Sequence, residues 1–162
     1  MNALKLAAVS CLYLGCSPVA PGTVGTLGGV AIAWALRDSE HYLLWTALVC
    51  VVLYVLGRSL ASWAEERAGK DPGIFVLDEV IGYLITVAWL KGPSLVTLAL
   101  GFAVFRFFDV LKPPPARRME RIPGGDGILL DDVVAGLFGF GVMVVARLFF
   151  GDASTWTWET PV

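Results

Sequence analysis

Five long stretches of the sequence contain no charged residue, and they constrain the fold more than any other feature. They are Val24–Leu36, Tyr42–Gly57, Val80–Leu90, Gly92–Phe105 and Val133–Ala146. Leu and Ala are frequent in them and strand-like alternation is weak, which favours helices. Each stretch is shorter than the roughly 20 residues that cross a bilayer upright. Two can be lengthened, because Tyr42–Gly57 continues to Ala68 before Gly69 and Pro72 stop it, and Val133–Ala146 continues to Phe150.

The composition favours a membrane-embedded protein. Charged residues make up 16% of the 162 positions and hydrophobic residues 57%, against roughly 25% charged in an average soluble domain. We therefore expect an all-α fold, a single-domain, membrane-embedded bundle over residues 1–162 with about five apolar helices. The alternative is a soluble bundle with buried hydrophobic helices, which the shortness of the stretches would favour.

Charge and cysteine content exclude several classes of function. The net charge is −2, so there is no basic field to attract nucleic acid. The three cysteines, Cys11, Cys16 and Cys50, are an odd number without a CxxC spacing, so neither a disulfide framework nor a zinc site is expected.

The basic residues predict an orientation in the membrane. If all five stretches span, one side of the membrane receives the N-terminus and the loops 58–79 and 106–132. This side carries nine of the twelve basic residues: Lys5, Arg58, Arg67, Lys70, Arg106, Lys112, Arg117, Arg118 and Arg121. The positive-inside rule places it in the cytoplasm. Trp34, Trp45 and Trp89 flank the opposite side, as an interfacial aromatic belt would.

Acidic residues gather in two groups on the predicted cytoplasmic side. In the first, Asp78 and Glu79 enter an apolar helix directly. Acids at a helix start interact favourably with its dipole, so capping is one interpretation. The other is a functional pair, because apolar neighbours on both sides would partly desolvate the two carboxylates and demand a counter-ion or metal.

The second group combines acids with bases. Arg106, Asp109 and Lys112 are spaced so that a helix places them on one face, either as a surface ion-pair ladder or as a functional set at membrane depth. A glycine-rich segment, predicted to be a flexible loop, follows at residues 124–127, and Asp131 and Asp132 are then expected to open the last helix.

Together these residues suggest phosphoryl chemistry. Carboxylates, waters and a substrate phosphate are the usual ligands of Mg²⁺, and Arg106 and Lys112 would complement a phosphate. The only histidine, His41, is expected on the opposite side, and no GxxxxGK[ST] loop or Cys-x₅-Arg spacing occurs. Water activated by a metal is the mechanism that remains.

Three blocks of sequence resemble the bacterial phosphatidylglycerophosphatase A family. Residues 15–27 are similar to its SPxxPGTxGTL pattern, and residues 78–82 to its DExxG pattern. Residues 106–115 and 124–136 are similar to RxFDxxKPxP and GGxGIxxDDxxAG. The blocks appear in the family's order and together are far more specific than any one of them.

This resemblance implies an all-helical bacterial inner-membrane enzyme, multi-pass, with its active site facing the cytoplasm. Its expected reaction is hydrolysis of phosphatidylglycerophosphate to phosphatidylglycerol and phosphate with Mg²⁺, in phospholipid biosynthesis. The implied catalytic acids are Asp78, Glu79, Asp109, Asp131 and Asp132, the last four of these also being the expected metal ligands. The implied phosphate-binding residues are Arg106, Lys112, Thr23 and Thr26, although helix capping explains either threonine equally well.

Other functions compete with this interpretation. A small membrane transporter or cation-binding membrane subunit would also use intramembrane acids, but along a transmembrane path rather than at one side. A CDP-alcohol phosphotransferase is disfavoured because its DGxxAR pattern is absent, and a purely structural membrane protein also remains open. For the phosphatase, we expect the lipid to reach the site sideways from the membrane.

Overall fold

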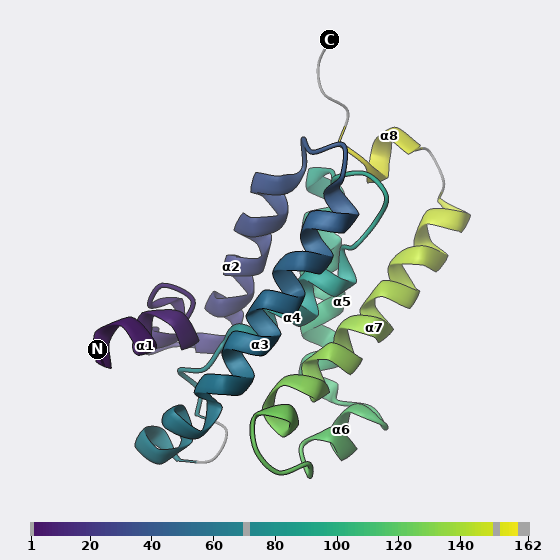
Figure 1. Cartoon of the computed structure of the whole chain (residues 1–162). Coiled ribbons are helices and arrows are strands. Elements are labelled where there is room, and N and C mark those ends of the chain that lie inside the picture. Colours follow the sequence, from purple (N-terminus) through teal and green to yellow (C-terminus); the bar gives the residue numbers. More distant parts are fainter. Residues whose placement is uncertain (1, 70–71, 151–152, 159–162) are drawn as a thin grey trace.

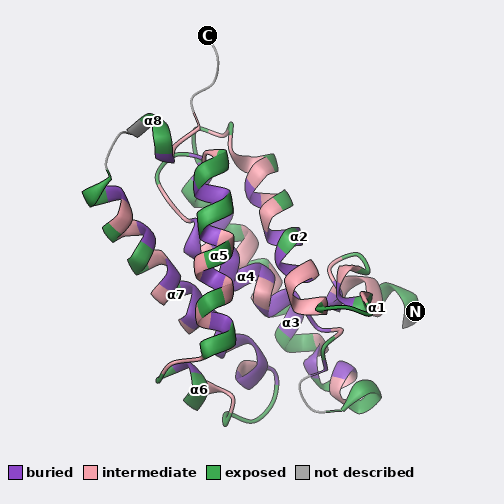
Figure 2. Ribbon diagram, turned by 180° about the vertical axis from the view of Figure 1, so that it is seen from behind, coloured by how far each residue is buried: buried purple, intermediate pink, exposed green. Residues whose placement is uncertain are grey.

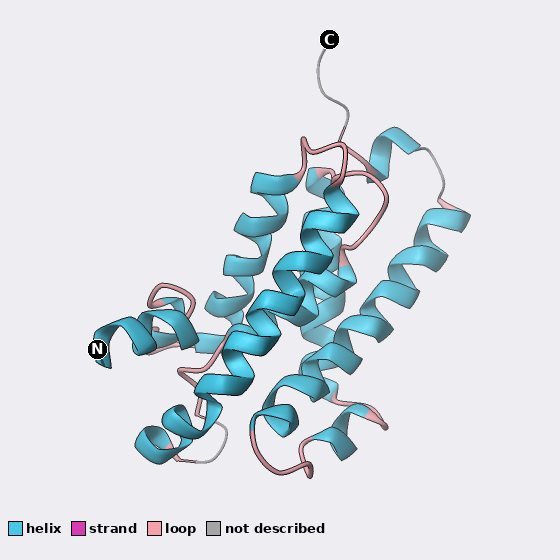
Figure 3. Cartoon of the chain, in the orientation of Figure 1, coloured by secondary structure: helices cyan, strands magenta, loops and turns pink. Residues whose placement is uncertain are grey.

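The computed structural model describes residues 2–69, 72–150 and 153–158, and within these ranges the chain forms helices and no strand (Figure 3). One isolated bridge joins Pro93 and Thr157. The elements, in chain order, are α1 (Asn2–Val9), the 3-10 helix η1 (Leu14–Cys16), α2 (Pro21–Leu36), α3 (Tyr42–Ala68), α4 (Leu77–Thr86), α5 (Leu95–Leu111), α6 (Ala116–Met119), α7 (Gly125–Phe149) and α8 (Ala153–Trp156). The expected all-helical fold is confirmed for the described residues.

The short helix α4 forms the centre of the bundle. It packs against α2, α3, α5 and α7, which run alongside it (Figures 1 and 2). Eight of its ten residues are buried, among them the two acids' neighbours Leu77, Val80 and Ile81. A helix that is apolar on nearly every face must be covered on every face, and α4 is covered by other helices rather than by solvent.

Glycines allow the helices to approach α4 closely. A Cβ on Gly25 would collide with Val76, and one on Gly29 would lie 2.8 Å from the Tyr83 ring. These two small residues therefore allow close packing of α2 against α4. In α7, Gly139 lies against Thr86 in the same way, whereas Gly141 has nothing within 4 Å and does not serve this purpose.

The number of spanning helices differs from expectation. Among the described residues, α3 and α7 are long and apolar enough to cross a membrane, whereas α2 and α5 have 16 and 17 residues and α4 only 10. The five apolar stretches are therefore largely helical, as predicted, but the expectation that about five helices are embedded as spans is wrong by length. Among the described residues, two helices are long enough to cross a membrane. The Val80–Leu90 stretch failed as a span because its helix ends at Thr86 and its remainder is a loop.

The outer surface of the bundle is apolar. Within the most apolar 18-residue segment of α3, only 11% of the residues are buried inside the molecule. Large hydrophobic side chains are exposed on α3, on α5 and on α7, including Leu44, Val52, Val96 and Val145. Contiguous exposed apolar surface of this kind marks contact with a membrane or a partner in most proteins.

The basic residues are concentrated at one end of the bundle. The start of α2, the end of α3, and α6 lie at one end, with most of the described basic residues; α8 lies at the other (Figure 1). Lys70 lies outside the described residues. At the sparsely charged end, the Arg37 guanidinium lies 3.4 Å from the Trp34 ring centroid and 4.5 Å from that of Trp158. Trp34 thus holds an arginine in addition to lying at the predicted aromatic end.

Candidate active site

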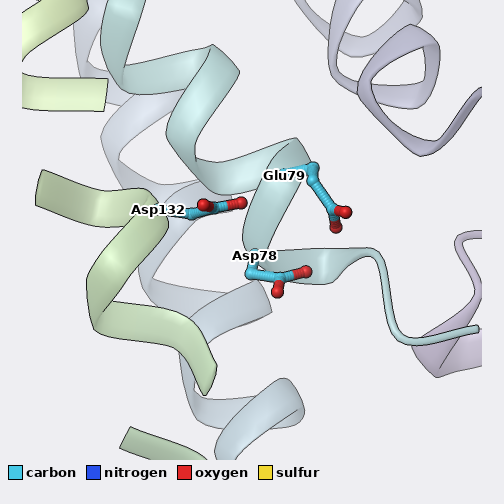
Figure 4. A group of neighbouring side chains, drawn as sticks. All are labelled: Asp78, Glu79 and Asp132. Atoms are coloured by element: carbon cyan, nitrogen blue, oxygen red, sulfur yellow. The ribbon is translucent and has the colours of Figure 1, made fainter. Parts of the chain in front are cut away.

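Three carboxylates from two helices meet at the basic end of the bundle. Asp78 and Glu79 lie in the first turn of α4, and Asp132 lies in α7. One oxygen atom from each lies within 4.8 Å of the others (Figure 4). Asp78 is 7% exposed and Asp132 is 3% exposed. Residues more than fifty positions apart in sequence therefore form a single buried acidic cluster, which we call the acid cluster.

Two oxygen atoms of the acid cluster have no hydrogen-bond partner within the described residues. Asp78 Oδ1 and Glu79 Oε2 are buried there without a hydrogen-bond partner. Burial raises the pKa of Asp78 well above its usual value, and the neighbouring Glu79 carboxylate raises it further. Burial likewise raises the pKa of Glu79, which also faces the charge of Asp109. Buried carboxylates without partners are costly, so this cluster has the properties of a cation-binding site.

Asp109 and Arg106 adjoin the acid cluster from α5. They form an ion pair across one turn of the helix, between Arg106 Nη1 and Asp109 Oδ2, as the spacing predicted. Asp109 is 9% exposed and interacts with both Asp132 and Glu79. A Cβ on Gly22 would collide with Glu79 Oε1 and lie 3.3 Å from Arg106 Nη1. The start of α2 therefore closes against the acid cluster and its arginine.

Lys112 and Asp131 form a second charged group beside the first. Lys112 Nζ donates to Asp131 Oδ2 at 2.6 Å and to Glu120 Oε1 at 2.9 Å. Burial lowers the pKa of Lys112, but the hydrogen bonds to Asp131 and Glu120 outweigh it, and the net pKa lies above the usual value. Glu120, which the sequence analysis did not single out, therefore shares this lysine. No spacing signal marks it, because the contact crosses the turn after the proline run.

The start of α7 corrects the predicted position of two acids. The helix begins at Gly125, with Gly124 at φ 77° as its N-cap, so Asp131 and Asp132 lie about two turns into the helix rather than at its opening. The segment predicted to be a flexible loop is helical from Gly125. Successive helix residues point about 100° apart, which explains why Asp132 joins the acid cluster while Asp131 faces Lys112.

The two candidate threonines differ in their surroundings. Thr26 is fully buried and its hydroxyl donates to the Gly22 carbonyl at 2.8 Å, which satisfies it within its own helix. Thr23 lies one residue past Gly22 in the first turn of α2 and is half-buried. Of the two, Thr23 is the one with solvent access.

Asp126, which lies outside the acid cluster, pairs with two polar side chains of α3. Asp126 accepts a hydrogen bond from the Tyr54 hydroxyl at 2.7 Å and forms an ion pair with Arg58 at 2.9 Å. It therefore joins α7 to α3. Because Tyr54 and Arg58 satisfy Asp126, it is not a candidate catalytic residue.

The acid cluster fits a divalent cation by its chemistry. Mg²⁺ takes carboxylate oxygens together with waters and phosphate oxygens, and the buried Asp78 and Asp132 with the half-buried Glu79 supply the first kind of ligand. Arg106 and the start of α2 place a cation and backbone amides on the same side, which suits a phosphate. Within the described chain these acids sit at one end rather than along a transmembrane path, which does not favour the transporter alternative.

The apolar exterior of the bundle and the acid cluster at one of its ends are the features expected of a membrane-embedded enzyme with a cation site. The sequence model of the phosphatidylglycerophosphatase A family matches residues 7–147, and the chain belongs to this family. It is 34% identical to phosphatidylglycerophosphatase A of Escherichia coli over 80% of this chain and 75% of the relative. It is 37% identical to the Haemophilus influenzae protein of the same name, over 74% of each.

A third relative carries a different name. A Bacteroides thetaiotaomicron protein, provisionally named as a phosphatidylinositol-3-phosphatase, is 38% identical over 85% of this chain and 89% of its own length. No solved structure matches the chain. The family resemblance stated from the three sequence blocks is confirmed, and the chain is a lipid phosphatase of a bacterial membrane-enzyme family.

Proposed function

We propose that this protein removes the terminal phosphate of phosphatidylglycerophosphate in a Mg²⁺-dependent hydrolysis that yields phosphatidylglycerol and phosphate for phospholipid synthesis. The observation that carries the proposal is the acid cluster of Asp78, Glu79 and Asp132 beside Arg106. The names of the Escherichia coli and Haemophilus influenzae relatives support the substrate.

Asp78, Glu79 and Asp132 would hold the metal, with Asp109 next to them. When bound, Mg²⁺ supplies a Lewis acid for the phosphate and lowers the pKa of water. The predicted ligand set contained Asp109 and Asp131 in place of Asp78. The hydrogen bond of Asp131 to Lys112 favours a positioning role for Asp131.

Arg106 would bind the phosphate and stabilise the charge that develops on its oxygens. Its pair with Asp109 fixes its position. The amides and the hydroxyl at Thr23, in the first turn of α2, would approach the same phosphate. Lys112, predicted to bind phosphate, forms ion pairs with Asp131 and Glu120. While both ion pairs are formed, its positive charge would act on the phosphate through the electrostatic potential at the site rather than by direct contact.

We place the site at the cytoplasmic boundary of the inner membrane in a multi-pass protein. The described basic residues are concentrated at the end of the bundle that holds the acid cluster, and the positive-inside rule assigns that end to the cytoplasm. The exposed apolar side chains of α3, α5 and α7 support embedding in lipid.

The name of the Bacteroides relative favours a second candidate substrate, phosphatidylinositol 3-phosphate. Both lipids present a phosphomonoester near the headgroup of a diacylglycerol lipid. They differ in the group that carries the phosphate, and the acid cluster and Arg106 alone do not distinguish between them.

Phosphate release from the purified protein in detergent tests the proposal. Phosphatidylglycerophosphate, phosphatidylinositol 3-phosphate and phosphatidate are compared in Mg²⁺, in chelator, and after Mg²⁺ is restored. We expect the fastest release from phosphatidylglycerophosphate, loss in chelator and recovery with Mg²⁺. Faster release from the inositol lipid would overturn the substrate assignment, and full activity in chelator would overturn the metal assignment. Asp132→Asn protein controls for a contaminating phosphatase.

A further inference from the structure

An apolar groove of about 430 Å³ runs along the outside of the bundle between α2 and α5. Its walls include Leu27 and Val30 from α2, and Leu98, Ala99 and Phe102 from α5. Trp34 and Leu95 line its far end. Nearly all of its lining is hydrocarbon, so its occupant must be hydrocarbon as well.

The groove leads to the acid cluster along both walls. On α2, Leu27 and Val30 share a helix face with Thr23, because the positions are four and seven residues apart. On α5, Ala99 and Phe102 share a face with Arg106, by spacings of seven and four residues. One turn beyond the lining residues Leu27 and Phe102, each helix therefore carries a residue that we assign to phosphate binding.

The distance from the start of α2 to the far end of the groove fits one leaflet of a bilayer. Thr23 and Trp34 are eleven residues apart on α2, which corresponds to about 16 Å at 1.5 Å per residue. The hydrocarbon core of a bilayer is about 30 Å thick, so one leaflet accounts for about half of it. A chain lying from the level of the phosphate site to Trp34 would remain within its own leaflet.

A second apolar groove provides a comparison. It has a volume of about 340 Å³ and includes Leu43, Ala47 and Cys50 from α3 and Phe140 from α7. Its walls do not share a face with Arg106 or Thr23, since neither α2 nor α5 contributes to it. Ala47 and Ala99 are both exposed alanines on a groove wall, so they form a matched pair for mutation.

The geometry points to the α2–α5 groove as the binding site for an acyl chain of the substrate lipid, with the lipid's phosphate held at Arg106 and Thr23. This inference rests on the proposed function. The lipid reaches the site from the side, between α2 and α5, and its diacylglycerol part does not leave the membrane. The groove selects for the presence and length of an acyl chain, whereas the acid cluster acts on the phosphate alone.

Ala99→Trp tests the inference by filling the groove. Phosphate release is measured in mixed micelles with dioleoyl and with dihexanoyl phosphatidylglycerophosphate. We expect the KM for the dioleoyl lipid to rise about tenfold, and both kinetic constants for the dihexanoyl lipid to change little. Ala47→Trp, in the other groove, should leave both substrates unaffected. Ala99→Leu should give a smaller rise, and it serves as the test variant if the tryptophan prevents folding.

The outcomes separate the inference from the function on which it rests. An unchanged KM for the dioleoyl lipid in Ala99→Trp and Ala99→Leu, or an equal rise in Ala47→Trp, would overturn the groove assignment while leaving the phosphatase activity intact. The second result would mean that ordinary membrane lipid covers both grooves. If the wild-type protein released phosphate from neither lipid, the proposed function would fail and the inference with it.

Discussion

Gly82 and Gly136 lie against each other where α4 crosses α7. A Cβ on Gly136 would collide with the Gly82 carbonyl and lie 2.9 Å from its Cα, and a Cβ on Gly82 would lie 2.6 Å from the Asp132 carbonyl. Each glycine follows an acid of the cluster by one helical turn, Gly82 after Asp78 and Gly136 after Asp132. The contact between backbones thus sets the distance between the carboxylates.

Gly136→Ala is expected to separate α4 from α7. The added methyl meets backbone rather than a flexible side chain, so the helices must shift, at a cost of about 1–3 kcal/mol in unfolding free energy. Because Asp132 moves with α7, activity should fall further than stability does. Thermal unfolding and phosphate release measure the two effects. Gly141→Ala is the control, since nothing lies within 4 Å of that position, and an equal loss in both variants would contradict the explanation.

Asp132→Asn is expected to reduce phosphate release by at least about 100-fold while the protein stays folded, because it removes one of three carboxylates from the proposed cation site. The asparagine has nearly the same shape, and it relieves repulsion among buried acids. Asp126→Asn, outside the acid cluster, should retain most of the activity. Comparable activity in Asp132→Asn and wild-type protein would exclude Asp132 from catalysis.

Lys112→Met is expected to lower stability and activity together, since it removes the ammonium group that donates to the buried Asp131. The loss should be about 1–3 kcal/mol in unfolding free energy. The double variant Lys112→Met, Asp131→Asn should recover stability. If it also recovers full activity, Lys112 has no role beyond balancing Asp131; persistent loss of activity at restored stability indicates a role of the charge in the reaction.

The pH dependence of stability should reveal the raised pKa values of Asp78 and Glu79. Both are higher in the folded protein than in the unfolded chain. In chelator, the protein is therefore most stable at low pH, where the two carboxyl groups are protonated in the folded and in the unfolded state. It loses stability as the pH rises through the pKa values of the folded state. Mg²⁺ should raise the melting temperature more at high pH, where the folded carboxylates are ionised, than at low pH. In Asp78→Asn protein the difference should shrink, and an equal Mg²⁺ effect at both pH values would contradict the assignment.

Helix ends with clear stop signals were predictable from the sequence. The extension of the Tyr42–Gly57 stretch to Ala68 is confirmed, because Gly69 and the following proline end it as expected. The last helix was predicted to reach Phe150 and ends at Phe149. The start of that helix was missed because Gly125 and Gly127 are poor helix formers, and only packing explains their helical state. A Cβ on Gly125 would lie 2.9 Å from Arg58.

The membership of the charged groups was predictable in part. The spacing of Arg106 and Asp109 placed them correctly on one face of a helix. The division between Asp131 and Asp132 was not predictable, because it depends on the rotation of α7 against α4. The contact of Glu120 with Lys112 was not predictable, because Glu120 reaches the lysine from a separate turn of the chain. Contacts of this kind produce no regular spacing of residues in the sequence.

The exposed hydrocarbon of α3, α5 and α7 has a consequence for how the enzyme's speed should be expressed. An enzyme that resides in the bilayer meets its lipid by lateral diffusion in two dimensions. Its rate then follows the mole fraction of substrate within the lipid or detergent phase. Diluting that phase with inert amphiphile should slow turnover even when the bulk molarity of substrate is constant.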